Sequence, residues 1–127
     1  MFDHVVFSVS DYEASKAFFL KALAPLGITI ASEGPLGLEL YRQGNNASLC
    51  IRRVEAAATH LHLAFTAENR EQVEKFYLAA LEAGAKDNGP PGIRPQYHAN
   101  YYAAVSYTHL RAHETVTLIS YAVFCLK

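Results

Sequence analysis

The residues with the clearest capacity for chemistry are two histidines near the C-terminus. The segment SYTHLRAHET (residues 106–115) places His109 and His113 four residues apart, with Glu114 beside them. On a helix, this spacing puts both imidazoles on one face, as in helix-borne metal sites. Taken alone, the segment predicts a metal site. Whether this interpretation holds depends on the secondary structure that carries the two histidines.

The composition indicates one ordinary globular domain. The chain has 127 residues, of which 51% are hydrophobic and 18% charged, enough for one core but not for two. Its net charge of −1 gives no reason to expect nucleic acid as a partner. The two cysteines are too few for a disulfide framework, so we expect a reducing cytoplasm. We expect no signal peptide, because the N-terminus has neither a basic start nor an apolar core. We expect no membrane partner, because no apolar run approaches the roughly 18 residues that span a bilayer.

Each half of the sequence opens with a strand followed by a helix. The first half begins HVVFSVS, a β-branched run that predicts a strand, and Asp11 then caps an amphipathic helix. The second half begins HLHLAFTA, and Asn69 caps the next helix. Three further strand-like pieces, separated by turn residues, follow the first helix. The first unit is therefore a βαβββ module.

A shift of 58 residues superimposes the second unit on the first. It aligns His4 with His62, and the phenylalanine three positions after each histidine, without a gap. A period of this size indicates a duplicated supersecondary module. We predict an α+β fold of two βαβββ modules, about residues 1–58 and 59–104, which together form an open, barrel-like cleft.

This pattern resembles the vicinal oxygen chelate superfamily. That group includes glyoxalase I-like lyases, epimerases, extradiol dioxygenases and bleomycin- or fosfomycin-resistance proteins. The matching segments are DHVVFSVSDYEASKAFFLKALAPLG and HLHLAFTAENREQVEKFYLAALEAGA, and the resemblance covers residues 1 to about 104.

The resemblance implies a divalent cation (Zn, Fe, Mn or Ni) in the cleft, with His4 and His62 as ligands. Neutral imidazoles suit these metals, and open coordination positions would hold two neighbouring substrate oxygens. The third ligand in the family is usually a Glu on the last strand of a module, and Ser48 stands near that place in the first module. His60 competes with His62 because it has the same strand parity. Alternatively, each histidine is a satisfied strand residue that binds no metal.

Residues 105–127 depart from the family pattern. The runs VSYTHLRAHET and ISYAVFCL match, in one frame and in order, the translated DNA of a sequencing-library adapter and its flow-cell primer. We therefore expect a domain over residues 1–104 and an adapter-derived tail, from a metagenomic reading frame that ran off its insert. The second module would then be truncated and lack its metal-binding Glu. His109, His113 and Cys125 would have no evolved role.

The tail nevertheless has the composition of two strands joined by a polar turn, so a structure could place it where the lost hairpin belongs. Family spacing counted from Ala104 puts the missing Glu near Thr115, with Glu114 adjacent. A shift of one residue turns a strand side chain to the opposite face. We therefore do not expect Glu114 to restore the site.

The segment GIRPQYHANYY gathers further polar side chains on a loop shaped by glycine and proline. Arg94 could hold a carboxylate bidentately, and His98 could act as a general acid or base near neutral pH. Tyr97 and Tyr102 are candidate substrate contacts. The alternative is that the tyrosines pack the sheet while Arg94 and His98 hold the loop in place.

These observations lead to a glyoxalase-like protein as the main hypothesis. In its intact form it would be a metal-dependent lyase, isomerase or dioxygenase acting on a small oxygenated metabolite, and the truncated chain would be impaired. The alternative is a metal-free protein that sequesters a drug or metabolite, as bleomycin-resistance relatives do. Two histidines at equivalent module positions favour the enzyme. Relatives often form dimers, so the resemblance also allows a homodimer.

Overall fold

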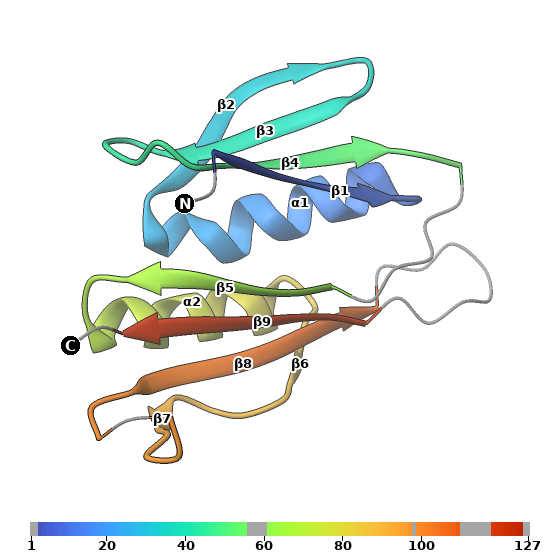
Figure 1. Cartoon of the computed structure of the whole chain (residues 1–127). Coiled ribbons are helices and arrows are strands. Elements are labelled where there is room, and N and C mark those ends of the chain that lie inside the picture. Colours follow the sequence, from blue (N-terminus) through green and yellow to red (C-terminus); the bar gives the residue numbers. More distant parts are fainter. Residues whose placement is uncertain (1–2, 56–60, 98, 110–117, 126–127) are drawn as a thin grey trace.

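The computed structural model describes residues 3–55, 61–97, 99–109 and 118–125, and Figure 1 labels their helices and strands. The first module consists of β1 (His4–Val9), α1 (Tyr12–Leu23), a short 3-10 helix η1 (Ala24–Leu26), β2 (Ile28–Gly34), β3 (Gly37–Arg42) and β4 (Ser48–Arg53). The second consists of β5 (Leu61–Ala67), α2 (Arg70–Glu82), β6 (Lys86–Asp87), β7 (Gly92–Ile93), β8 (Tyr102–His109) and β9 (Leu118–Cys125).

Both helices begin at the capping residues predicted from the sequence. The Asp11 carboxylate accepts a hydrogen bond from the backbone N–H of Ala14 at 3.1 Å. The Asn69 side chain accepts one from the N–H of Gln72 at 2.9 Å. Each cap satisfies an N–H that has no partner within the helix. Both helix starts therefore depend on local side-chain-to-backbone hydrogen bonds.

The two modules have matching strand orders, which confirms the predicted α+β class and the duplicated βαβββ plan. In the first sheet the order is β1-β4-β3-β2, and β4 runs parallel to β1. In the second the order is β5-β9-β8-β6, with β7 also paired to β8, and β9 runs parallel to β5. Strand β9 thus takes the place in its sheet that β4 has in the first. The C-terminal residues complete the second sheet, and His109 is the last residue of a strand rather than part of a helix.

Both helices lie on the same side of the molecule and pack against each other (Figure 1). The buried side chains between the helices and the sheets form one core that includes Phe7, Phe19, Ile51, Phe76 and Ala104. Because strand residues alternate between faces, the side chains between these core positions point to the opposite, open face of each sheet.

The neighbouring edges of the two sheets are β1 and β5, which run in opposite directions (Figure 1). Since they belong to separate sheets, no ladder of backbone hydrogen bonds joins these two described strands. Side chains must fill the space between them. Neither of the described helices is long and apolar enough to cross a membrane.

Candidate functional site

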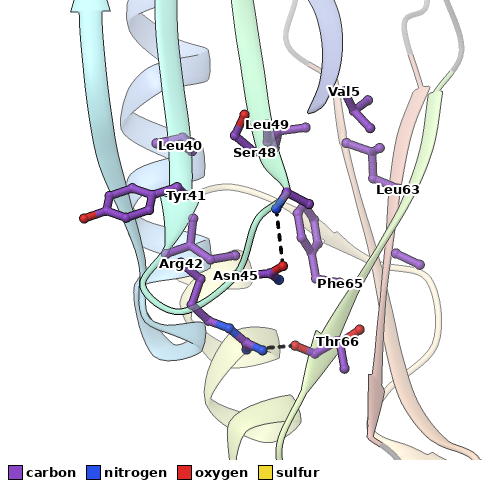
Figure 2. A pocket seen from close by; sticks show the side chains of 13 residues that line it. Val5, Leu40, Tyr41, Arg42, Asn45, Ser48, Leu49, Leu63, Phe65 and Thr66 are labelled. Carbon is purple, nitrogen blue, oxygen red and sulfur yellow. Dashed lines mark hydrogen bonds between the residues drawn. The ribbon is translucent and has the colours of Figure 1, made fainter. Parts of the chain in front are cut away.

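A cavity of about 220 Å³ lies between the first sheet and β5 (Figure 2). Its apolar wall is built from the helix-facing side chains of both modules: Val5, Ile28, Leu40, Leu49, Leu63 and Phe65. Val5 and Leu63 point toward one another from β1 and β5. The cavity exists because these two edge strands are not hydrogen-bonded to each other, so packing between them is incomplete.

One end of this cavity is polar. Figure 2 shows Arg42, Asn45 and Thr66 together there, away from Val5 and Leu63. Arg42 Nη1 donates a hydrogen bond to the backbone oxygen of Thr66 at 3.2 Å, which joins the end of β3 to the end of β5. Asn45 Oδ1 accepts one from the backbone N–H of Ala47 at 3.3 Å. The β3–β4 turn therefore carries polar groups to the mouth of an apolar cavity.

His4, one of the predicted metal ligands, lies on the open face of the first sheet, with its side chain 55% exposed. Its Nδ1 is 2.8 Å from Asp3 Oδ2. The residue paired with His4 on the parallel neighbour β4 is Ser48. Glu39 and Tyr41 line a shallow hollow near it together with Asp3 and Ser48.

His62, the second predicted ligand, is exposed on β5. It alternates with Leu61 and Leu63, which pack against the core, so it points to the open face. Its register partner on β9 is Ser120. Each module therefore pairs its first-strand histidine with a serine. His60, the competing candidate, lies outside the described residues.

The donor set in the described part of the chain does not fit a three-ligand metal site. Among those residues, no group of three His, Cys, Asp or Glu side chains lies close enough together to hold a metal ion. Serine is the register partner of both histidines, whereas a divalent transition metal prefers a carboxylate or a further imidazole. Glu114 and Thr115, the positions considered for a third ligand, lie outside the described residues.

Arg94 and Tyr97, predicted as substrate contacts, belong to the loop between β7 and β8. Arg94 Nη2 donates a hydrogen bond to the backbone oxygen of Pro90 at 2.9 Å, and the Arg94 N–H donates one to Tyr101 O at 2.6 Å. The Tyr97 ring is 69% exposed and its centroid lies 4.8 Å from that of Tyr101. These contacts shape the loop itself. His98, the predicted acid–base residue, lies outside the described residues.

Tyr102 faces α2 rather than the open face that carries His62. Its hydroxyl donates a hydrogen bond to Glu74 Oε1 at 3.0 Å. The guanidinium of Arg70 lies 4.9 Å from the centroid of its ring. Both partners are on α2, so Tyr102 joins the helix to its sheet. The structure thus does not bring Tyr102 together with His4 or His62.

Arg42 and Asn45 are the site residues that sequence reasoning missed. In the sequence, the segment YRQGNN has only the pattern of a strand end followed by a turn. A charged side chain at a strand end beside such a turn is a weak signal, because most such residues are solvated. What makes these two residues part of a site is the approach of β5, which is distant in the sequence.

Comparison with known protein families shows which superfamily this chain matches. The profile of the Glyoxalase/Bleomycin resistance protein/Dioxygenase superfamily matches residues 1–106. The chain belongs to this superfamily. The resemblance predicted from the repeat is therefore confirmed. No curated protein matches the sequence.

Solved structures share this fold over nearly all of the chain. The glyoxalase/bleomycin resistance protein from Albidiferax ferrireducens T118 is 27% identical, with a TM-score of 0.78, covering 97% of this chain and 98% of that one. A family enzyme from Burkholderia phytofirmans PsJN is 17% identical, with a TM-score of 0.70 and coverage of 97% and 96%. TioX from Micromonospora sp. ML1 is 13% identical, with a TM-score of 0.66 and coverage of 97% and 98%. The last two likenesses concern the fold alone.

Proposed function

We propose that this glyoxalase-superfamily chain binds a small molecule in the cavity between β1 and β5, without needing a metal ion. The observation that carries the proposal is the cavity itself: an apolar wall with a few convergent polar groups at one end. Its lining comes from both modules, so a ligand there would contact both halves of the fold rather than one loop. This is the binding-protein alternative drawn from the sequence.

Binding of a one-ring probe to the full chain tests this proposal. We expect phenylacetate or phenylacetamide to bind with a Kd of roughly millimolar or below, given the size of such ligands. A Val5→Phe substitution fills the apolar end of the cavity and should abolish binding. Val6→Phe is the matched control, because Val6 is 43% exposed and points to the other face of β1.

The outcome of the paired variants decides the proposal. Loss of binding in Val5→Phe with retention in Val6→Phe supports it, provided that circular dichroism shows both variants folded. If neither phenylacetate nor phenylacetamide binds to the wild-type chain, the proposal is overturned. Equal binding by both variants overturns it as well, since the ligand would then lie elsewhere.

A metal-dependent lyase, isomerase or dioxygenase in the intact form is the second candidate, and His4 favours it. A carboxylate hydrogen-bonded to Nδ1 of a histidine orients the ring and leaves Nε2 for a metal. Asp3 stands in that relation to His4. His62 would be the equivalent ligand of the other module, and a carboxylate outside the described residues would have to complete the set. Zn, Fe, Mn or Ni would suit such donors.

We also propose a cytoplasmic location and a small molecule as the main partner. The paucity of cysteine and the near-neutral net charge of −1 support this assignment. A homodimer is compatible with the exposed side chains of His4 and Val6 on β1 and of His62 and Ala64 on β5. Sedimentation at several concentrations distinguishes a dimer from a monomer.

A further inference from the structure

We propose that the ligand of the cavity between β1 and β5 is a small apolar anion, and that Arg42 recognises its charge. This inference rests on the proposed function, because it concerns the same cavity. It adds the chemical class of the ligand and its orientation. The anionic group would lie at the polar end, and the hydrocarbon part would lie between Val5 and Leu63.

The charges around the cavity favour an anion. Arg42 is the one charged side chain among the described residues that line it, and no carboxylate is among them. Within the described part of the chain, Arg42 makes no ion pair, and its hydrogen bond to the Thr66 oxygen uses one of five guanidinium N–H groups. The remaining donors can bind a carboxylate bidentately. A half-buried guanidinium without a counter-ion is a recognisable anion site.

A neighbouring side chain supplies a further donor. Because Asn45 Oδ1 already accepts from the backbone N–H of Ala47, the Asn45 amide nitrogen is left to donate. Arg42 is held in place by its own bond to the Thr66 backbone, so less side-chain entropy is lost when an anion binds. The mouth is thus a cluster of donors around one positive charge.

The size of the cavity limits the size of the ligand's hydrocarbon part. Its volume of about 220 Å³ exceeds that of engineered protein cavities of about 150 Å³, which bind benzene. A single six-membered ring or a chain of comparable volume therefore fits, together with a carboxylate at the mouth. A charged group at the Val5 end would meet mainly apolar side chains and would be disfavoured. The expected class is a one-ring or short-chain monocarboxylate.

Isothermal titration of the full chain with phenylacetate and its neutral analogue phenylacetamide tests the inference. We expect phenylacetate to bind roughly tenfold more tightly, because a charge-assisted bond to guanidinium replaces a neutral one. Raising the salt concentration should reduce this preference. Arg42→Met should remove the preference while leaving phenylacetamide binding, and Arg42→Lys should retain part of it.

Arg52→Met is the matched control. Arg52 is exposed on β4 and does not line the cavity, so the preference should be unchanged in this variant. Equal affinities of the two probes for the wild-type chain, or a preference that survives Arg42→Met, would overturn the inference while the proposed function stands. If neither probe binds, both fail. Should Arg42→Met not fold, the Arg42→Lys variant and the salt dependence decide.

Discussion

The Tyr12 hydroxyl donates a hydrogen bond to Glu33 Oε1 at 2.9 Å, which ties the first turn of α1 to β2. Lys16 Nζ lies 2.7 Å from the same carboxylate, and the guanidinium of Arg53 lies 4.4 Å from the centroid of the Tyr12 ring. Tyr12 is only 4% exposed. Burial, reinforced by the bond to Glu33, raises the pKa of Tyr12 to about 12. The junction between α1 and its sheet is therefore sensitive to alkaline pH.

Tyr12→Phe should reduce the loss of stability in alkali. The folded-state pKa of about 12 lies above the ordinary value of 10.0, so folding favours the neutral phenol. The associated stabilisation is complete below pH 10 and is lost as the pH rises from 10 to 12. Urea unfolding at pH 7 to 12 should therefore show a steeper decline in the wild type over that window. At pH 7 the variant should lose about 1 kcal/mol with its hydrogen bond.

Tyr97→Phe is the control for this experiment, because Tyr97 is 69% exposed. It should follow the wild-type pH profile. Parallel profiles of Tyr12→Phe and the wild type between pH 10 and 12 would contradict the assignment of this titration to Tyr12.

Thr108→Val should stabilise the chain. Ser106 and Thr108 are buried on the face of β8 that packs against α2, and their hydroxyls have no hydrogen-bond partner among the described residues. A buried hydroxyl without a partner costs about 1–3 kcal/mol, and valine has nearly the same shape. We expect a gain of about 1 kcal/mol, or roughly 4 °C in Tm, by thermal unfolding.

Thr29→Val, at an exposed position of β2, is the matched control and should change stability by less than about 0.5 kcal/mol. A loss of stability in Thr108→Val would mean that its hydroxyl has a partner outside the described residues.

The chain as given should bind Zn²⁺ weakly, and Ser48→Glu should strengthen the binding. Ser48 is the register partner of His4, so a carboxylate there would project from the same face about 5 Å away. We expect at least a tenfold gain in affinity by competition with a chelating dye. Adding His4→Ala should cancel the gain.

Ser8→Glu is the control for the added charge. Ser8 lies on the same face of β1 but pairs with Arg52 rather than with a histidine. It should leave Zn²⁺ affinity unchanged. Near-stoichiometric metal in the unsubstituted chain, lost on His4→Ala or His62→Ala, would instead favour the metal-dependent enzyme.

Tyr102→Phe should weaken the fold without weakening ligand binding. The substitution removes the hydrogen bond to Glu74 but keeps the ring beneath Arg70. The expected cost is about 0.5–1 kcal/mol in urea unfolding. Phenylacetate affinity should be unchanged, because Tyr102 does not line the cavity. A large fall in affinity with unchanged stability would restore Tyr102 as a substrate contact.

The sequence by itself determined the two modules. Helix caps, strand alternation and turn residues act over a few neighbours, so Asp11 and Asn69 could be recognised as helix starts without a structure. The equivalence of His4 and His62 also came from the sequence, because a duplication preserves spacing. Their exposure on equivalent strands agrees with that equivalence.

Only the tertiary structure decided which side chains share a site. Arg42 and Thr66 meet because β5 lies along the edge of the first sheet, a contact between residues 24 positions apart that no local pattern encodes. Strand alternation likewise predicts that Tyr102 points to the opposite face of the sheet from the residues on either side of it. It does not predict which of the two faces α2 covers. Local periodicity fixes elements and faces, whereas the incomplete packing between β1 and β5 creates the cavity. That packing depends on all the side chains of the core together.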